Sequence, residues 1–512
     1  MQAVGSESFP RPFPFGVAVG RGSLARSGID CGMPIKPILP ALLFICLCLA
    51  CSGSHQNQQP ATFVAPNIVL VFVDDLGFGD LGCTGGEYRT PNIDRLATEG
   101  AFFTDFSVAQ PVCSASRAAL LTGCYPNRIG IHGALGPSNR HGLDPDETTL
   151  AEMLQEQGYA TAIFGKWHLG LQQELLPTRQ GFEHFAGIPY SNDMWPQHPE
   201  SDAYPPLPLF EQEQIVEHDP DQRKFTRGFA QRGVEFIEQS VAEQRPFFLY
   251  LPQPMPHVPL FVSDEFDGHS GKGLYGDVVE EIDAAVGMIL ATLDELQIAD
   301  NTLVIFASDN GPWLSYGDHA GTTGGLREGK GTVFEGGVRE PLLMRWPKAI
   351  PAGLKVREHA MAIDMLPTIA TFTQANLPTR TIDGRDISPL LTAATESLDP
   401  EHAYFYWYNR NELQAMRSGK WKLHFPHGYR TMNDRELGSG GMPGKYDYSV
   451  KTGLELYDLG ADPTESDDVA ADHPEVVAGM NALADTMRGR LGDKLQDVVG
   501  TDVREPRHFP TD

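Results

Sequence analysis

Cysteine is scarce in this chain, and its scarcity excludes a fold held together by disulfides. The 512 residues contain seven cysteines, and four of these precede residue 52. A disulfide scaffold needs many cysteines in a short chain, so the fold must depend on an apolar core instead. The sequence also lacks the paired Cys-x-x-Cys motifs that are typical of a structural zinc site.

Positive charge is also in short supply. The 39 lysines and arginines face 67 aspartates and glutamates, which gives a net charge of -28. Nucleic acids and anionic membranes attract basic surfaces, so this balance excludes them as the main partners. An anionic ligand would have to be bound by a local basic pocket, because the overall field repels it.

The sequence has no long apolar run, and Ile38–Ala50 is too short to span a bilayer. Its length fits a signal-peptide core instead. The sequence Leu-Ala-Cys-Ser-Gly at 49–53 resembles a bacterial lipobox with Cys51 as the lipidated residue, although Cys48 replaces the usual aliphatic residue. We therefore expect export to the bacterial periplasm or cell surface, with membrane contact only through a lipid anchor at Cys51. An uncleaved anchor is the alternative, and Met33 is an alternative start.

Short apolar, β-rich segments are each followed by polar residues of chemically useful types. These segments are Asn67–Val73, Thr161–Phe164, Phe247–Leu251 and Leu303–Ala307. Helical patterns at 93–99, 148–157, 229–243 and 278–296 separate them. This alternation predicts an α/β fold with a mostly parallel central sheet flanked by helices. Because ligands bind beyond the carboxyl ends of such strands, the polar residues should meet at one site.

The pattern changes near Asp383, where 383–391 is interpreted as a boundary helix. Shorter strand patterns follow, and the last helical pattern covers 474–491. The strand patterns lie at 403–408, 415–417, 421–425 and 455–459. This order predicts a smaller C-terminal antiparallel sheet with one helix. The predicted organisation is a signal and linker segment at 1–61, a large α/β domain at 62–395 and a small α+β subdomain at 396–512.

A cysteine and an arginine four residues apart, Cys113 and Arg117, begin a predicted short helix that Gly123 ends. This spacing places both side chains on one helical face. The helix N-terminus offers free N–H groups, which favour an anion. The arrangement indicates an oxyanion pocket that contains a nucleophile, although a buried cysteine beside a surface arginine is the plainer alternative.

Oxygen donors follow two of the predicted strands: Asp74 and Asp75 after the first, and Asp309 and Asn310 after the last. Clustered carboxylates repel one another unless a cation neutralises them, and hard oxygens suit Ca²⁺ or Mg²⁺ better than zinc. A helix cap or a turn would explain a lone Asp-Asp pair equally well.

Cationic and acid–base side chains follow other strands. Lys166 and His168 are two residues apart, which in an extended segment would place both on one side. His257 stands between prolines, and Lys330 lies in a glycine-rich segment. By themselves a salt-bridged lysine and a structural histidine would explain these residues.

Together these motifs resemble the type I sulfatases of the alkaline-phosphatase-like superfamily. The resemblance runs from about Asn67 to Pro463 and includes every fixed position of the signature from Cys113 to Gly123. The hexapeptide Gly165–Gly170 is a further specific match, and Ser191 matches arylsulfatase A-like members most closely. The segments 68–77, 304–312, 256–259 and 329–337 also match.

The resemblance implies a covalent mechanism in the domain at 62–395. Cys113 would be oxidised by a maturase to formylglycine (3-oxoalanine), whose hydrated aldehyde is the nucleophile. Ala115 replaces the proline of many members, so oxygen-dependent and radical-dependent maturases both stay open. The implied catalytic residues are Cys113, Arg117, Lys166, His168, His257 and Lys330. The implied Ca²⁺ ligands are Asp74, Asp75, Asp309, Asn310 and residue 113.

We therefore expect an exported, arylsulfatase-like sulfuric ester hydrolase. Its partner would be a sulfated small molecule or glycan, with a carbohydrate or aryl sulfate as substrate. Substrate contacts are predicted for Ser191, Trp195, His427 and Arg430. A phosphoester or phosphonate hydrolase of the same fold is the nearest alternative. A surface lipoprotein that binds sulfated glycans without turnover is the alternative of a different class.

Overall fold

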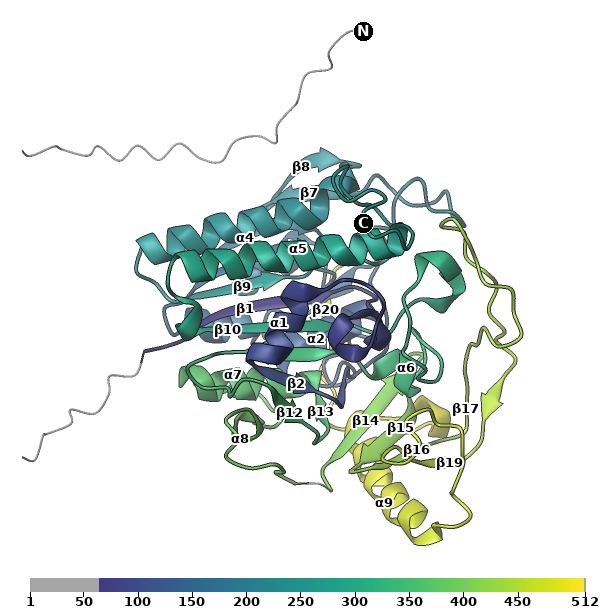
Figure 1. Ribbon diagram of the computed structural model, residues 1–512. Coiled ribbons are helices and arrows are strands. Elements are labelled where there is room, and N and C mark those ends of the chain that lie inside the picture. Colours follow the sequence, from purple (N-terminus) through teal and green to yellow (C-terminus); the bar gives the residue numbers. More distant parts are fainter. Residues whose placement is uncertain (1–63, 400, 511–512) are drawn as a thin grey trace, which may run out of the picture. The chain divides into compact units, whose positions relative to one another are not determined.

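A ten-stranded sheet forms the centre of the computed structural model, which describes residues 64–399 and 401–510 (Figure 1). Its strand order is β12-β2-β11-β10-β1-β9-β5-β6-β7-β8. The five central strands, from β10 to β6, run parallel, and antiparallel pairs follow on both sides. In sheet order the strands are Leu354–Val356, Ala101–Phe103, Leu342–Arg345, Thr302–Ser308, Asn67–Val73, Phe247–Leu251, Ala160–Lys166, His184–Ile188, Pro208–Glu211 and Gln214–His218. The predicted fold class is confirmed.

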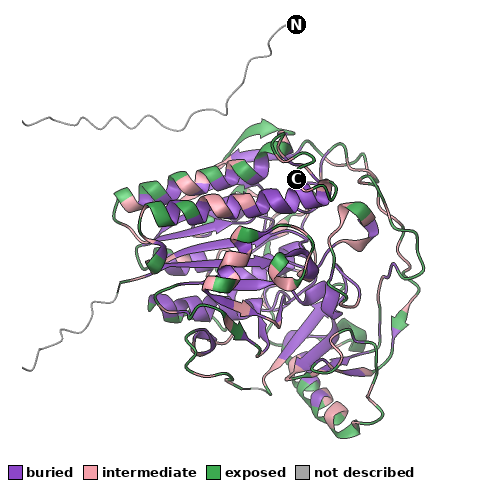
Figure 2. Cartoon of the chain, in the orientation of Figure 1, coloured by how far each residue is buried: buried purple, intermediate pink, exposed green. Residues whose placement is uncertain are grey.

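Both faces of the central sheet are buried, which explains its continuous apolar strands. In β1, Val69, Val71 and Val73 belong to one apolar cluster, whereas Ile68 and Phe72 belong to the cluster on the opposite face. Figure 2 shows the central strands as buried and the outer sides of the long helices as exposed.

Helices cover both faces of the sheet. Residues of α1 (Pro91–Glu99), α4 (Phe225–Ala242) and α5 (Leu274–Glu295) pack in one apolar cluster. Residues of α2 (Cys113–Thr122), α3 (Leu150–Gln155) and α7 (Met365–Thr373) pack in the other. The helices predicted at 93–99, 148–157, 229–243 and 278–296 are confirmed, with ends that differ by a few residues.

A smaller antiparallel sheet follows in the chain, in the order β14-β15-β16-β19. Its strands are Ala403–Tyr408, Glu412–Ser418, Trp421–His424 and Glu455–Asp458, and α9 covers Pro474–Leu491. The predicted small sheet with one helix is therefore confirmed. Its boundary at 395/396 stays a prediction, because both sheets belong to one compact unit. Short bridging pairs are β3 (Phe106–Ser107) with β13 (Ala360–Met361), β4 (His141–Gly142) with β20 (Arg507–His508), and β17 (His427–Gly428) with β18 (Lys451–Thr452).

The boundary helix predicted at 383–391 is wrong in its first half, since only α8, Ser388–Leu391, is helical. The backbone N–H groups of Asp383 and Gly384 donate to the carbonyl of Gly123, where α2 ends. The Asp383 carboxylate binds the Arg128 guanidinium at 2.6 Å. These long-range contacts replace the local helical bonds that the sequence pattern predicts.

Export and lipidation were predicted on residues 1–61, which lie outside the described residues. Within the described part, no helix is both long and apolar enough to cross a bilayer.

Candidate active site

Parallel strand ends bring the predicted acids together. In the register of β1 and β10, Val73 faces Ser308, so Asp74 and Asp309 follow at the same edge. Carboxylate oxygens of Asp74, Asp75 and Asp309 lie within 4.8 Å of one another, and all three side chains are buried. The backbone N–H of Asp75 donates to Oδ1 of Asp309 at 3.2 Å. The acidic cluster that the sequence predicted therefore forms.

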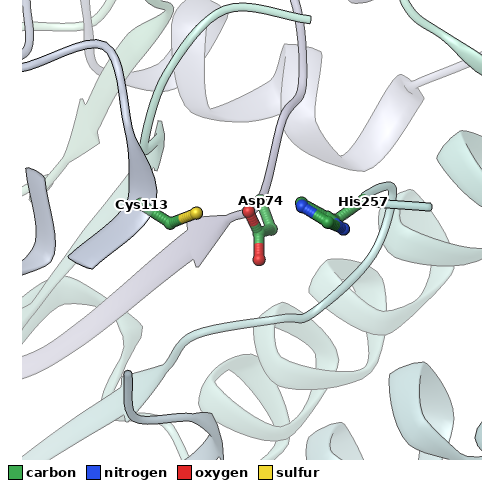
Figure 3. Close-up of side chains that lie close together, drawn as sticks. All are labelled: Asp74, Cys113 and His257. Carbon is green, nitrogen blue, oxygen red and sulfur yellow. The ribbon is translucent and has the colours of Figure 1, made fainter. Parts of the chain in front are cut away.

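Helix α2 brings the predicted nucleophile to this cluster. It begins at Cys113 and ends at Gly123, whose φ of 67° is the left-handed conformation that glycine favours. Cys113 is buried, and Figure 3 shows its sulfur pointing to Asp74, with His257 on the other side. Burial raises the pKa of the Cys113 thiol to about 11, so the unmodified side chain is protonated at neutral pH.

Each carboxylate of the cluster faces a buried cation. Arg117 Nη2 lies 2.7 Å from Asp309 Oδ2, and Lys330 Nζ lies 2.7 Å from Asp75 Oδ1. Lys166 Nζ forms an ion pair with Asp74. Lys330 Nζ is also 3.8 Å from the sulfur of Cys113. Paired charges of this kind are what the burial of so many ionised groups requires.

Burial and neighbouring charges shift the pKa values of Asp74 and Asp309 in opposite directions. Burial opposes ionisation of Asp74, but Lys166, His257 and Arg117 hold its pKa below the ordinary range. Burial and the Asp74 charge raise the pKa of Asp309 to about 7. Two carboxylates this close ionise together only when a further positive charge is present.

The backbone conformation that places His168 in the site was not predicted from its spacing to Lys166. Strand β5 ends at Lys166, and His168 has a left-handed φ of 62°, so strand alternation does not orient it. Its Nε2 lies 2.7 Å from the carbonyl oxygen of Leu135. A carbonyl only accepts, so Nε2 carries the proton and Nδ1 keeps its lone pair. Nδ1 is buried without a partner, and burial together with Lys166 holds the pKa of His168 well below its usual value.

His257 and Ser191 complete the polar wall. His257 Nε2 lies 3.6 Å from Asp75 Oδ2 and 3.5 Å from Ser191 Oγ. Ser191 Oγ in turn accepts a hydrogen bond from Lys166 Nζ at 3.1 Å. Nδ1 of His257 lies 2.6 Å from the Val258 carbonyl, so this nitrogen carries the proton of the neutral ring.

Comparison with family models shows to which family this chain belongs. The model described as Sulfatase matches residues 66–375, more than half of the chain. The chain belongs to the sulfatase family. The model described as C-terminal region of aryl-sulfatase matches 400–504, and the model described as N-sulphoglucosamine sulphohydrolase, C-terminal, matches 329–435.

Individual relatives agree with the family models. Arylsulfatase A of Bos taurus is 44% identical over 386 residues, which cover 70% of this chain and 75% of the relative. N-acetylgalactosamine-6-sulfatase of Canis lupus familiaris is 35% identical, covering 83% of this chain and 84% of the relative. The solved structure of the PsFucS1 sulfatase from Pseudoalteromonas sp. superposes with a TM-score of 0.72 at 27% identity, covering 83% and 91% of the two chains. The protein is a sulfuric ester hydrolase, as predicted, and the phosphoester alternative is set aside.

The oxygen donors of the sulfatase fit a hard divalent cation. Asp74 Oδ1 and Asn310 Oδ1 are both buried without a hydrogen-bond partner. Asn310 Nδ2 donates to Asp75 Oδ1 at 2.7 Å, which fixes the amide beside the carboxylates. Four oxygen-bearing side chains with two unused buried oxygens match the ligands that Ca²⁺ prefers. Cys113 Sγ lies within 4.8 Å of oxygen and nitrogen atoms of Asp74 and His257.

Two of the predicted substrate contacts lie in apolar or aromatic packing. Trp195 is buried, and its ring packs edge-on against that of Phe261 at 5.8 Å. His427 bonds to the Phe425 carbonyl at 2.6 Å, and its ring lies 6.3 Å from that of Phe334. Their contact with substrate stays a prediction. By contrast, Arg430 donates from Nε to the carbonyl oxygen of Lys330 at 3.0 Å.

The sequence analysis missed Trp313. Its ring lies 5.5 Å from that of His257 and 4.6 Å from Lys330 Nζ. The available signal was its position, three residues after Asn310 and directly after the matched segment 304–312. Tyr408 was also missed; it comes from β14 and packs on the small cluster that contains Cys113.

Proposed function

We propose that the sulfatase cleaves carbohydrate or aryl sulfate esters with a formylglycine at position 113 and a bound Ca²⁺. The observation that carries this proposal is the arrangement of buried cations and carboxylates around Cys113. Three carboxylates face Arg117, Lys166 and Lys330, so the side-chain charges balance. A divalent cation would leave the site with net positive charge, which favours a sulfate monoester although the whole chain carries -28.

The residues in and around the carboxylate cluster would have distinct roles in catalysis. Asp74, Asp75, Asp309 and Asn310 would hold the cation, which supplies electrostatic stabilisation of charge on the sulfate oxygens. Formylglycine supplies a hydrated aldehyde whose hydroxyl is a nucleophile. Arg117, Lys166 and Lys330 would bind and orient the sulfate oxygens through charge-assisted hydrogen bonds.

Proton transfer is assigned from the histidine tautomers. Nδ1 of His168 has a free lone pair in a buried position, so His168 would accept a proton from the nucleophile side. Lys330 lies beside Cys113; burial opposes its charge, but Asp75, Cys113 and Asp74 together raise its pKa. Lys330 would therefore be protonated and would donate to the leaving-group oxygen, with His257 as its neighbour.

Substrate class and maturation are supported by the relatives. Arylsulfatase A and N-acetylgalactosamine-6-sulfatase are named for aryl and sugar sulfates, and both are at least a third identical to this chain. The matched segment at Cys113–Gly123 supports action by a formylglycine-generating maturase. Binding of sulfated glycans without turnover would leave the buried lone pair of His168 unused, so we favour the enzyme.

Mass spectrometry combined with a substrate panel tests the proposal. The chain is produced with and without a formylglycine-generating maturase, and the peptide that contains Cys113 is analysed. We expect an aldehyde in place of the thiol, and sulfate release from aryl or sugar sulfates only in the matured sample. Cys124→Ala, at a buried cysteine on the far side of Gly123, is the control and should keep both properties. Full activity from the unmodified thiol would refute the nucleophile assignment.

We also propose export, with a lipid anchor at Cys51. The support is the sequence of residues 38–53 alone. Cell fractionation with metabolic labelling by a fatty acid tests it: the wild type should be labelled and membrane-bound. Cys51→Ala should lose the label and the membrane association, and equal labelling of both would contradict the anchor.

A further inference from the structure

Arg430 is a cation that lies beside the active site. Its Nε and Nη2 donate to the carbonyl oxygen of Lys330, the first at 3.0 Å. Among residues 64–399 and 401–510, no carboxylate forms an ion pair with it, whereas Arg117 and Lys330 are both paired. A half-buried guanidinium that bonds only to a carbonyl and a hydroxyl retains most of its charge for an anion.

Aromatic rings flank this guanidinium and connect it to the reacting centre. We call Trp313, Tyr446 and Tyr448 the aromatic rim. The Arg430 guanidinium lies 4.4 Å from the centre of the Tyr446 ring and 5.9 Å from that of Trp313. Trp313 in turn lies 4.6 Å from Lys330 Nζ, which is 3.8 Å from the Cys113 sulfur. The ring of Trp313 therefore contacts both Arg430 and Lys330.

The outermost ring can make room for a ligand. Tyr448 is 71% exposed, and its ring lies 6.1 Å from that of Tyr446. Its hydroxyl accepts a hydrogen bond from Arg430, a contact that an incoming anion could replace. Tyr446 is held more firmly, since its hydroxyl accepts from the backbone N–H of Ser315 at 3.4 Å. The Tyr446 ring and the Arg430 guanidinium together offer a flat apolar surface and one charge contact.

We propose that Arg430 and the aromatic rim bind a second anionic group of the substrate. The preferred substrate is then a sulfated sugar with a further carboxylate or sulfate near the ester that is cleaved. This inference rests on the proposed function, because it describes how the same sulfate ester substrate is bound at the end away from the cleaved bond. The fork of the guanidinium matches both carboxylate and sulfate, and the rim packs against the sugar ring between the two charges.

Two substrates separate this role from a structural one. The first is 4-nitrophenyl sulfate, which has one charge, and the second is a disaccharide of a sulfated hexosamine and a uronic acid. A hydrogen-bonded charge contact is worth roughly 1.5–3 kcal/mol, which corresponds to about 10- to 150-fold. We expect Arg430→Ala to lower kcat/KM for the disaccharide by about that factor, mainly through KM. The value for 4-nitrophenyl sulfate should change less than about threefold, and Arg430→Lys should recover part of the loss.

Arg435→Ala is the matched control, since Arg435 lies in the same loop but pairs with Asp447. Arg435→Ala should leave kcat/KM for both substrates unchanged. Equal losses on both substrates in Arg430→Ala would overturn the proposal and indicate that Arg430 only positions Lys330 through its carbonyl.

A binding measurement keeps this test separate from the proposed function. If the matured wild type released no sulfate from either substrate, the proposed function would fail. Calorimetric binding of the disaccharide would still decide the role of Arg430. Weaker binding to Arg430→Ala than to Arg435→Ala supports the second anionic contact, and equal binding excludes it.

Discussion

At the scale of single residues, charge balance organises the active site. Three buried carboxylates face three buried cations within a few ångströms of Cys113. The sequence predicted these residues because each follows a strand or begins a helix within a matched motif. It could not predict their pairing, since Asp75 and Lys330 are far apart in the chain and meet only through the sheet register and the loop before α6 (Glu335–Val338).

His168 shows the limit of spacing arguments. Its separation from Lys166 indicated a shared face of an extended segment, but the left-handed backbone at His168 breaks that alternation. The side chain still reaches a buried position, with Nε2 bonded to Leu135. A spacing of two residues indicates a shared face only within a regular strand. Residues at functional sites often adopt uncommon backbone conformations, to which this rule does not apply.

Removal of the His168 base should slow turnover without unfolding the protein. Because its Nδ1 is the unpartnered acceptor, His168→Ala is expected to lower kcat by about a hundred- to ten-thousand-fold. Steady-state sulfate release measures this, and the thermal midpoint checks the fold. His473→Ala, at the start of α9, is the control and should behave as the wild type. Undiminished turnover in His168→Ala would disprove the base assignment.

Removal of a carboxylate from the cluster should abolish cation binding. Asp309 faces Asp74 and Asp75, and its loss removes one of the oxygen ligands that the cluster offers. We expect Asp309→Ala to lose tight Ca²⁺ binding, measured by calorimetry, and nearly all activity. Asp300→Ala, an exposed acid before the other end of β10, should retain both. Stoichiometric calcium in Asp309→Ala would contradict the proposed ligand set.

At the scale of elements, the C-terminal sheet holds the segment that follows Lys330. Lys422 of β16 forms ion pairs with Glu335 of α6 at 2.7 Å and with Glu465 at 3.1 Å. Glu465 also accepts from the backbone N–H of Glu335 at 2.6 Å and pairs with His424. Since α6 begins five residues after Lys330, these contacts tie the small sheet to the active-site loop.

Elements were predictable wherever local pattern and tertiary structure agree. Strand β1 and helix α9 were predicted to the residue, because continuous apolar runs and amphipathic periodicity decide them. The segment at 383–387 was not, because its backbone bonds go to Gly123 instead of to its own helix. Contacts between residues distant in sequence leave no local pattern, which is also why the role of Trp313 was missed.

Breaking the buried network should destabilise the protein strongly. Lys422→Met removes the buried cation that Glu335 and Glu465 share, and leaves Glu335 with Arg339 and Glu465 with His424. Removal of one partner from a buried ion pair typically costs about 3–5 kcal/mol. We expect a clear fall in the urea midpoint. Lys420→Met, two residues away, removes an exposed pair with Asp458, and such pairs are worth about 0–1 kcal/mol. Equal midpoints for the two variants would show that the network contributes little.

At the scale of the whole molecule, stability should depend on buried carboxyls outside the cluster of Asp74, Asp75 and Asp309. Burial raises the pKa of Asp80 to about 7, against hydrogen bonds from Thr322 and Gly77. Burial also raises the pKa values of Asp283 and Asp364 to about 6. Each group binds its proton more tightly in the folded than in the unfolded chain, whose carboxyls have ordinary values near 3.8.

This difference in proton binding fixes the sign of the contribution that these carboxyls make to the pH dependence of stability. Between pH 7 and pH 4 these carboxyls hold more protons in the folded than in the unfolded state, so their contribution to the free energy of unfolding rises as the pH falls. Buried histidines such as His359 and His424, whose pKa values burial lowers, act in the opposite direction below about pH 6.5. For Asp80 the change between pH 7 and pH 5.5 amounts to roughly 2 kcal/mol. The depressed pKa values of Asp105 and Glu335 reduce stability only at lower pH, when those carboxylates become protonated. Lower net charge acts in the same direction as Asp80, because it weakens self-repulsion from the charge of -28.

We therefore expect the difference in thermal midpoint between the wild type and Asp80→Asn, both in excess calcium, to shift in favour of the wild type from pH 8 to pH 5.5. Scanning calorimetry at constant ionic strength measures it. Asp80→Asn keeps the shape of the side chain but cannot titrate, so it lacks the contribution of this carboxyl. Asp277→Asn is the comparison, because the pKa of Asp277 is lowered in spite of burial, by hydrogen bonds from Ser270, and its slope should match the wild type in this interval. If wild type and Asp80→Asn had the same slope, the buried carboxyl at position 80 would not be the source of the pH dependence.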